Sequence, residues 1–218
     1  MEDNGILLET LIGIFTIEHS KIKVLLTRRS EEPYKGYWSL LGNDLAFNET
    51  LENNVTDVVI EQAGLSNVNV EQCHTFSNLD RGLEDRKIAV TFIGIIDSKT
   101  VELKRQQNSY ELGWFDIEDI PKTGFDHDYL INYMIDFLKK KLLNIASLKL
   151  LFPSDFSLPE LQKVYEQILD KNLDRRNFRK KLLSLDLIEE TGYFNEGYSG
   201  RPAKLYKFKS LSDEGDLF

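Results

Sequence analysis

The stretch GNDLAFNETLENNVTDVVIEQAGL, residues 42–65, decides the fold. It predicts the end of a strand, a tight loop and one amphipathic helix that stops at Gly64. Asn48 is a suitable N-cap, because its side-chain oxygen can accept a hydrogen bond from a free N–H group of the first turn. Glycine suits the left-handed conformation in which helices often end. Four apolar residues recur at helical spacing and predict one buried face: Leu51, Val55, Val58 and Val59.

This stretch resembles a Nudix box, whose family pattern is G-x5-E-x7-R-E-U-x-E-E-x-G-U with U apolar. With the pattern aligned on Gly64, its isolated glutamate falls on Glu49, and the first glutamate of its Glu-Glu pair falls on Glu61. Other family positions are substituted, and the residues that stand there are Asn43, Asp57, Val58 and Gln62. The helix of the motif and its terminal glycine are present, but most of the charged side chains that the family uses for catalysis are replaced. A capped core helix without Nudix ancestry also fits this stretch alone.

The substitutions predict a chain with no catalytic residues and no metal. Three carboxylates at positions i, i+3 and i+4 share one helix face and can hold Mg2+ beside a diphosphate. Val58, Glu61 and Gln62 stand at those positions, so one carboxylate and one amide replace three carboxylates. Such a pair is a poor cage for a hard ion that prefers several oxygen ligands. We therefore expect a protein that is not an enzyme and needs no cofactor.

The composition is that of an ordinary globular protein with one large domain or two smaller ones. Of the 218 residues, 41% are hydrophobic and 29% are charged, which allows a sizeable core without disulfides. Cys73 is the single cysteine, which excludes an intrachain disulfide and a cysteine-based zinc site. The first residues, MEDNGILLETLIGIFTI, are acidic, and Glu9 interrupts their apolar run. They predict neither a signal peptide nor a membrane span, and hence a cytoplasmic protein.

The net charge of −9 is distributed unevenly along the chain. Residues 1–147 contain 15 basic and 24 acidic residues, whereas the remainder contains 12 of each. Within residues 171–209 there are 10 basic and 5 acidic residues. A basic segment in an acidic protein indicates a local anionic partner, with nucleic acid as the first candidate. A solvated face of lysines and arginines is the alternative for any single run of charge.

The first two-thirds of the chain predict a mixed α+β domain. Apolar, β-branched runs predict strands, and the first two form a hairpin: Leu7–Ile17, Ile22–Thr27, Ser39–Gly42, Val70–Phe76, Lys87–Ile96 and Glu111–Ile117. A helix is expected at Tyr129–Leu143, with Asp126 as its cap, and it would link the two domains. Strands around a central helix favour a mixed α+β sandwich, and the resemblance to the Nudix box implies that it is a Nudix-like α/β/α sandwich, which we place at residues 1–144.

The C-terminal region, residues 145–218, predicts a winged helix-turn-helix. Ser157 begins a capping-box pattern that opens the helix Leu158–Leu169. Asp174 is the expected N-cap of a second, basic helix at Arg175–Leu185, which would bury Phe178, Leu182 and Leu185. Two short strands at Leu187–Glu190 and Ala203–Phe208 can pair as the wing. Helix, turn, basic helix and two-stranded wing are typical of DNA-binding domains.

Several segments resemble landmarks of the Nudix-related transcription regulators, in which a Nudix domain that senses a small molecule precedes a winged helix. They are PYKGYWSLLGN at 33–43, HTFSNLDRGLEDRKIAV at 74–90, GFDHDYLI at 124–131, DRRNFRKKLLSLDLIEETG at 174–192 and GRPAKLYKF at 200–208. The resemblance covers nearly the whole chain. It implies a DNA-binding regulator, expected to be a repressor. A homodimer is expected because one winged helix covers too few base pairs for genomic specificity.

In a helix-turn-helix, the second helix enters the major groove with its N-terminal residues near base edges. Arg175, Arg176 and Asn177 occupy that end, and arginine can bind guanine as asparagine can bind adenine. Phosphate or groove contacts are expected from the basic residues that follow on the helix and wing: Arg179, Lys180, Lys181, Arg201 and Lys204. A role in capping is the alternative for Asn177, and a solvated loop is the alternative for Arg201.

Members of the resembling family recognise either ADP-ribose, in the control of NAD metabolism, or pentose sugars, in the control of sugar utilisation. The eroded box favours the second group, so we expect a pentose effector, with L-arabinose first and ADP-ribose as the alternative. The candidate ligand-binding residues are Arg28, Trp38, Asn43, Asp44, Glu61, Arg86 and His127. For His127, a place in the first turn of the helix is an equal alternative.

Two hypotheses from other classes stay open. One is an active Nudix hydrolase with an accessory module, in which Glu49 and Glu61 hold the metal. The other is an interaction module whose winged helix binds protein instead of DNA. Hydrolysis of a nucleotide diphosphate with Mg2+ would support the first. Binding to duplex DNA with a steep salt dependence would argue against the second.

Overall fold

The computed structural model describes residues 5–82, 85–97, 103, 111–152, 154–195 and 202–209. The chain divides into two compact units. The first unit contains the chain up to Thr16 and Lys23–Phe137, and the second contains Ile17–Ile22 and the chain from Leu138 onward. No helix among the described residues is long and apolar enough to span a membrane.

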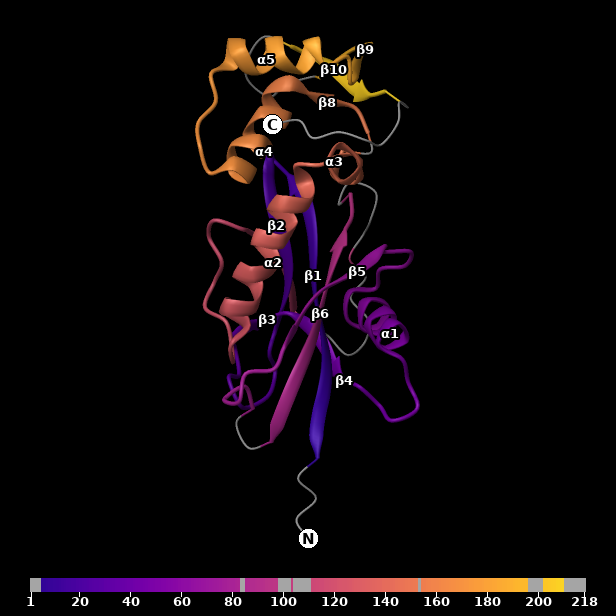
Figure 1. Ribbon diagram of the computed structural model, residues 1–218, viewed down its shortest axis with the longest axis vertical. Coiled ribbons are helices and arrows are strands. Elements are labelled where there is room, and N and C mark those ends of the chain that lie inside the picture. The colour runs from indigo at the N-terminus through magenta and orange to yellow at the C-terminus, as the bar shows by residue number, and fades with distance from the viewer. Residues whose placement is uncertain are drawn as a thin grey trace. The chain divides into compact units, whose positions relative to one another are not determined.

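A seven-stranded sheet forms the centre of the first unit (Figure 1). Five strands lie in the order β3-β2-β1-β6-β5, while β4 pairs with β1 and β7 pairs with β2. The strands are β1 (Ile6–Glu18), β2 (Lys21–Arg28), β3 (Trp38–Ser39), β4 (Leu41–Asp44), β5 (Val70–Phe76), β6 (Arg86–Ile95) and β7 (Glu111–Asp116). These bounds agree closely with the predicted strands, except that the predicted strand Ser39–Gly42 is divided between β3 and β4.

The long strand β1 holds the sheet together because it pairs with three neighbours. It runs antiparallel to β2 and β4 and parallel to β6, with Ile6 opposite Arg86 and Phe15 opposite Ile95. Residues 10–17 of β1 are all buried. A continuous buried run is typical of a strand that is covered on both faces. The predicted hairpin of β1 and β2 is confirmed.

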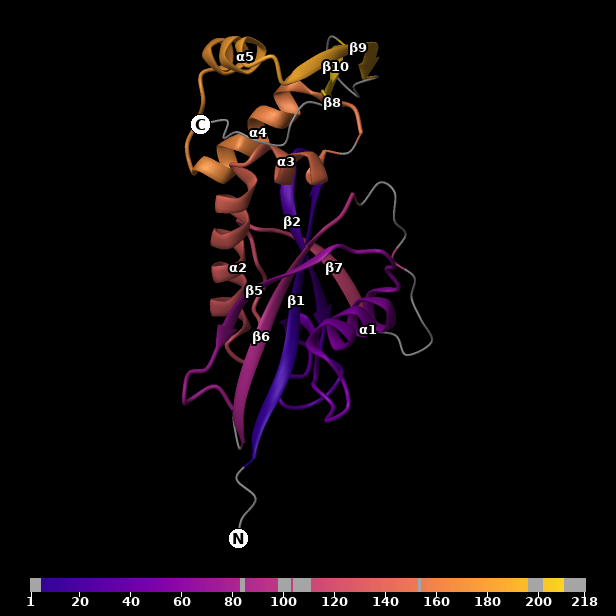
Figure 2. The same ribbon diagram turned by 45° about the vertical axis from the view of Figure 1, so that its right-hand side comes forward.

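Helix α1 (Leu51–Ala63) covers one face of this sheet, and the first part of α2 (His127–Leu142) lies on the other (Figure 2). The N-cap of α1 is Thr50, whose hydroxyl accepts the N–H of Asn53 at 3.2 Å. The prediction of Asn48 as the cap is therefore wrong by two residues, because Thr50 has the extended backbone that brings its side chain over the first turn. The predicted end at Gly64 is confirmed, with φ of 67°.

Asp126 stands at the start of α2 as predicted, but the prediction that its side chain caps the helix is wrong. The Asp126 backbone carbonyl accepts the N–H of Leu130 at 3.2 Å, as at any helix start. Its carboxylate instead accepts two hydrogen bonds from Arg81. A guanidinium that arrives from a distant loop offers a charged, two-pronged donor, which is stronger than a single backbone N–H.

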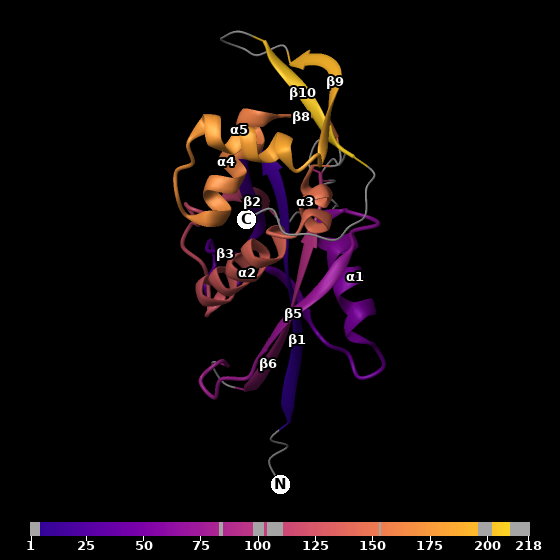
Figure 3. The same ribbon diagram turned by 45° about the horizontal axis from the view of Figure 1, so that its top comes forward.

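The second unit is a helical domain with a small three-stranded sheet in the order β8-β10-β9. Its elements after α2 are α3 (Ile145–Leu151), β8 (Phe156–Ser157), α4 (Leu158–Leu169), α5 (Arg175–Ser184), β9 (Ile188–Asn195) and β10 (Ala203–Phe208). Figure 3 shows β9 and β10 side by side, extending away from α4 and α5. The sequence did not predict α3 or β8, which are both short.

The caps of the two helices that the sequence predicted here are confirmed. Ser157 Oγ accepts the N–H of Glu160 at 3.3 Å, and the Asp174 carboxylate accepts the N–H of Asn177 at 2.9 Å. Phe178 is buried on α5 as expected. Leu185 was expected to be buried and is 39% exposed, because α5 ends at Ser184 and the chain turns after it.

Candidate functional site

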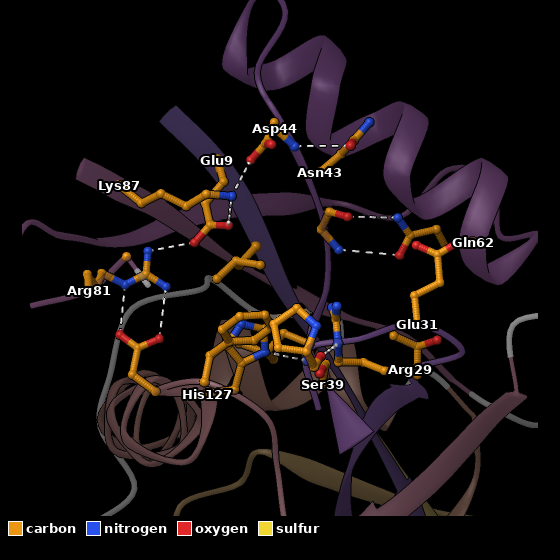
Figure 4. A pocket seen from close by; sticks show the side chains of 18 of the residues that line it. Glu9, Arg29, Glu31, Ser39, Asn43, Asp44, Gln62, Arg81, Lys87 and His127 are labelled. Carbon is orange, nitrogen blue, oxygen red and sulfur yellow. Dashed lines mark hydrogen bonds and ion pairs between the residues drawn. The ribbon is translucent and has the colours of Figure 1, made fainter. Parts of the chain in front are cut away.

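The first unit contains a cavity of about 960 Å³. Its walls come from β1, β2, β3, β4 and β6, from the loop that follows β2, from the loop between β5 and β6, and from one residue of α1 and the start of α2 (Figure 4). Pockets for small molecules in proteins have volumes of roughly 300–1,000 Å³. The cavity is therefore large enough for a ligand of nucleotide size.

One wall of the pocket is a chain of ion pairs. The Arg81 side chain is only 3% exposed and lies between Glu9, at 2.6 Å from Nη1, and Asp126, at 2.7 Å from Nε. Burial acts to lower the pKa of the guanidinium, but the neighbouring carboxylates of Asp126 and Glu9 raise the pKa above its ordinary value. Arg81 therefore stays charged, and both of its partners are held by it.

The chain of ion pairs continues to the other side of the pocket through Lys87. Its Nζ lies 2.9 Å from Oδ1 of Asp44 and 3.8 Å from Oε2 of Glu9. Arg81 is buried and Lys87 is half-buried, and each of these two cations has two carboxylate partners. The result is a rigid, fully paired wall that joins β4, β1 and β6 (Figure 4).

His127 forms part of the pocket and is 6% exposed. Its Nδ1 accepts the backbone N–H of Leu40 at 3.0 Å. Burial is the largest cause that lowers the pKa of this imidazole, to about 4, with Arg81 and Arg29 acting in the same direction against Asp126. His127 is therefore neutral at pH 7, and because Nδ1 is an acceptor, the proton resides on Nε2.

Arg29 brings a second guanidinium to the pocket. Its Nε donates to the carbonyl of Pro33 at 2.8 Å, and the group lies 4.8 Å from the centre of the Phe125 ring. Within the part of the chain that the structure describes, its terminal nitrogens make no hydrogen bond or ion pair. Phe125 has φ of 54° and packs edge-on against Tyr34 at 4.9 Å. A non-glycine residue in the left-handed region is strained, and such residues concentrate at functional sites.

The residues at the eroded box positions do not fit a magnesium cage. Val58 is buried in the core, at 2% exposure. The Gln62 amide is engaged by the backbone of a single residue, since Nε2 donates to the Gly42 carbonyl at 2.8 Å and Oε1 accepts the Gly42 N–H at 3.3 Å. Glu61 is exposed and does not line the pocket. Among the described residues, no group of three or more histidine, cysteine, aspartate or glutamate side chains is placed to hold a metal ion.

The structure brings four of the predicted ligand-binding residues together in the pocket: Arg28, Asn43, Asp44 and His127. Three others lie elsewhere. Trp38 packs edge-on against Phe115, with ring centres 4.6 Å apart, and Arg86 donates to the carbonyl of Ser77 at 2.6 Å. Glu61 is the third, on the exposed side of α1.

Sequence reasoning missed Arg29, Arg81 and Glu9, which all line the pocket. Arg81 and Arg86 belong to the same quoted segment, and the sequence gave no reason to prefer one of them. The sequence offered one signal for Arg29, which is its place beside Arg28 in a basic pair, and both residues line the pocket.

In the second unit, α5 presents a basic surface. Phe178 and Leu182 are buried beneath it, at 4% and 0% exposure. The predicted DNA-contacting residues of the helix are all exposed: Arg175, Arg176, Asn177, Arg179 and Lys180. Because the backbone N–H of Asn177 completes the cap with Asp174, its side chain takes no part in that capping bond.

The wing contributes less free positive charge than the sequence predicted. Lys204 donates to Glu190 at 2.7 Å, and this ammonium is the main cause that lowers the pKa of the Glu190 carboxyl. Lys204 is thus paired with an acidic neighbour on β9. Arg201 lies outside the described residues.

Comparisons with known proteins agree with this architecture. Residues 149–208 match the NrtR DNA-binding winged helix domain. The chain is 30% identical over 201 residues to the ADPR responsive transcriptional repressor NtrR of Acinetobacter baylyi, covering 90% of this chain and 80% of that protein. It is also 33% identical over 113 residues to the ADP-ribose pyrophosphatase of Methanocaldococcus jannaschii, covering 51% of this chain and 66% of that enzyme.

The crystal structure of Shewanella oneidensis NrtR complexed with a 27mer DNA matches with a TM-score of 0.74 at 29% identity, over 93% of each chain. Both units of the present fold therefore have counterparts in one solved protein, and the predicted fold class, a Nudix-like α+β domain followed by a winged helix, is confirmed. Because the match to the Acinetobacter baylyi repressor also extends through both units, the chain belongs to the NrtR family of Nudix-related transcriptional regulators.

Proposed function

We propose that this protein is a DNA-binding transcriptional repressor that ADP-ribose regulates through the pocket of its first unit. The observation that carries the proposal is the match to a repressor described as ADPR responsive, at 30% identity over 80% of that protein. The Methanocaldococcus jannaschii enzyme, which matches 51% of this chain, is named for the same molecule. Two relatives with different activities thus have ADP-ribose in common.

The comparisons support the ADP-ribose alternative better than the pentose expected from the sequence. That expectation depended on the eroded Nudix box. Val58 and Glu61 of the box do not line the pocket, and Gln62, which does, is hydrogen-bonded to the backbone of Gly42, so these substitutions bear on metal binding more than on the choice of effector. A cavity of about 960 Å³ is also at the upper end of the range for small-molecule sites, and one pentose would leave most of it unfilled.

The charges of the pocket suggest where the diphosphate of ADP-ribose would bind. Arg81 and Lys87 are already paired with carboxylates. Arg29 keeps terminal N–H groups without a partner among the described residues, and it is held in place by Pro33 and Phe125. A guanidinium is well suited to bind phosphate oxygens with two hydrogen bonds. We assign the diphosphate to Arg29.

We further infer that ADP-ribose is bound and not hydrolysed. Hydrolysis of a diphosphate by a Nudix-type site needs a metal cage, and Gln62 is engaged with the Gly42 peptide while Val58 is in the core. The loss of hydrolysis suits a regulator, because the occupancy of its pocket then depends on the effector concentration alone.

The DNA-binding half of the proposal rests on α5. Its exposed end carries Arg175, Arg176 and Asn177, which is the end that reads bases in helix-turn-helix proteins. One winged helix covers too few base pairs for a specific genomic site, so we propose a homodimer on a near-palindromic operator. Light scattering at micromolar concentration that gives the mass of one chain, with and without operator, would contradict the dimer.

Titration calorimetry with purified protein tests the effector directly. ADP-ribose is expected to bind with one site per chain, whereas L-arabinose and D-xylose give no heat at the same concentrations. Arg29→Ala is expected to weaken ADP-ribose binding by roughly 10-fold or more, because it removes charged hydrogen bonds. Arg86→Ala is the matched control, since Arg86 lies outside the pocket and binds the Ser77 carbonyl. Binding of a pentose but not ADP-ribose would overturn the proposal.

A further inference from the structure

The wing carries an acidic residue, Glu190 on β9, next to the basic surface of α5. Its Oε2 accepts a hydrogen bond from the ammonium of Lys204 at 2.7 Å, and its Oε1 accepts one from the hydroxyl of Tyr206 at 3.2 Å. The Lys204 hydrogen bond is the largest cause that lowers the pKa of the Glu190 carboxyl, and the charge of Arg179 on α5 acts in the same direction. A negative charge therefore lies among the cations that are the candidate DNA contacts.

Glu190 has a close counterpart on the other face of the wing. Successive side chains of a strand point to opposite faces, so the neighbouring Glu189 lies on the face away from Glu190. Glu189 pairs with Lys207 at 3.1 Å, much as Glu190 pairs with Lys204. The side chains of both pairs are about half exposed. The wing thus carries two similar ion pairs, one on each face, and the Glu190 pair is on the face next to Arg179.

An exposed ion pair of this kind can exchange its partners, because water and salt screen the attraction between the two charges. A phosphate of DNA can bind the ammonium of Lys204 only if it displaces the Glu190 carboxylate, which then repels the duplex. The affinity of a protein for any duplex depends on how many phosphates its lysines and arginines neutralise. Glu190 therefore lowers the part of the affinity that does not depend on DNA sequence.

We propose that Glu190 limits the affinity of the winged helix for the phosphate backbone, because it holds Lys204 and repels phosphates close to Arg179. This inference rests on the proposed function. Contacts from the N-terminal residues of α5 to the bases then decide a larger share of operator binding. A moderate affinity also suits a repressor that has to leave its operator, because allosteric coupling usually changes an affinity by only about 5-fold to 150-fold.

Glu190→Gln tests the proposal, because the amide oxygen can still accept hydrogen bonds from Lys204 and Tyr206 while the negative charge is removed. Fluorescence anisotropy of the full chain is measured over a range of salt concentrations, with an operator selected from a random duplex pool and with an unselected duplex. The variant is expected to bind both duplexes about 3-fold to 10-fold more tightly at about 0.1 M salt. The plot of log K against log salt is expected to steepen by about 1, since one more phosphate contact forms.

Glu189→Gln is the matched control. It makes the same change of net charge one residue away and weakens the same kind of ion pair, but on the opposite face of the wing. Its affinity for either duplex and its salt slope are expected to stay close to the wild-type values. The thermal midpoints of the two DNA-free variants are expected to agree, so that a difference in DNA binding is not a difference in folding.

The double variant Glu190→Gln, Lys204→Ala identifies the cation that is released. If Lys204 forms the additional phosphate contact in Glu190→Gln, its removal from that background takes the contact away again. The salt slope of the double variant is therefore expected to return to the wild-type value. Because the two residues act through one contact, their effects on operator affinity are expected to be non-additive.

The possible failures are distinguishable. If wild type binds no duplex, the proposed function fails and the inference fails with it. If wild type binds DNA and the two glutamine variants bind it equally well, the DNA-binding function stands and the role of Glu190 is wrong. Weaker operator binding by Glu190→Gln would show that the carboxylate favours the complex, which overturns the inference. A salt slope that stays steep in the double variant would overturn the part assigned to Lys204.

Discussion

Arg81 and Asp126 are joined by two parallel hydrogen bonds, Nε to Oδ2 at 2.7 Å and Nη2 to Oδ1 at 3.0 Å. They belong to segments 45 residues apart, the loop after β5 and the residue before α2. His127 follows Asp126 directly, so this contact also fixes the first residue of α2 in the pocket wall. The pair therefore links the shape of the pocket, which we propose binds the effector, to the position of a helix.

Arg81→Ala is expected to lower the free energy of unfolding by about 3 kcal/mol, because it leaves the Glu9 and Asp126 carboxylates without their partner. This is the lower end of the range for buried pairs, since Asp126 is still 32% exposed. Chemical denaturation at pH 7 measures the change. Lys207→Ala is the control: its bridge to Glu189 is exposed on both sides, and its loss should cost less than about 1 kcal/mol. Equal effects of the two changes would contradict the buried network.

His127 predicts a loss of stability in mild acid. Burial lowers its pKa from 6.5 to about 4, so between these values the unfolded chain binds more protons than the native protein. Stability from this group is therefore present above pH 6.5 and is lost as the pH falls toward 4. Between pH 7 and pH 5 the loss is on the order of 2 kcal/mol.

The His127 contribution is measured by comparing wild type with His127→Asn. Because other acidic groups titrate in both proteins, the quantity of interest is the difference between their unfolding free energies at pH 7 and at pH 5. The variant is expected to lose less stability on acidification than wild type. Identical pH profiles would mean that His127 is not buried in its neutral form.

The proposal that ADP-ribose is bound and not hydrolysed is testable at Gln62. Its amide both donates to and accepts from the Gly42 peptide. Gln62→Glu restores the family glutamate but removes the donor, so it is expected to destabilise the protein by about 1–3 kcal/mol without producing activity. Purified wild type and variant are assayed with Mg2+ or Mn2+ over nucleotide diphosphates. Turnover near 1 per second or more in wild type, lost in Glu61→Gln, would favour the hydrolase hypothesis instead.

The basic surface of α5 predicts two kinds of DNA contact. Arg175→Ala is expected to cost about 1–3 kcal/mol of operator affinity and to relax sequence preference, as for a residue that reads a base. Lys180→Ala is expected to weaken all duplexes similarly and to reduce the salt slope by about 1, as for a phosphate contact. Lys122→Ala, in the first unit, is the control. A salt dependence that is flat in wild type would favour a winged helix that binds protein.

The sequence predicts well where local chemistry determines structure. Gly64 ends α1, and Ser157 and Asp174 cap α4 and α5, because a cap depends on residues within one turn. It fails where a distant partner intervenes. Asp126 offers the same local signal as Asp174, but Arg81 takes its carboxylate, and no spacing in the sequence indicates a partner 45 residues away.

In the candidate site, too, the sequence predicts some residues correctly and misses those whose position depends on distant partners. The sequence indicates that His127 and Asp44 belong to a ligand domain, and both line the pocket. It cannot tell Arg81 from Arg86, since one residue of a loop turns inward only because Glu9 and Asp126 meet it there. Trp38 was expected to bind the ligand, but it does not line the pocket, and its ring packs edge-on against Phe115 of β7.

Operator affinity in the presence of candidate effectors tests the central claim most directly. An operator selected from a random duplex pool is titrated by fluorescence anisotropy at one fixed salt concentration, alone and with saturating ADP-ribose, L-arabinose or D-xylose. An inducer shifts the equilibrium only if it binds the DNA-incompetent state more tightly. We predict that ADP-ribose weakens operator binding by roughly 5-fold to 150-fold, the usual range of allosteric coupling, while the pentoses change nothing. A pentose that weakens operator binding when ADP-ribose does not would contradict this account.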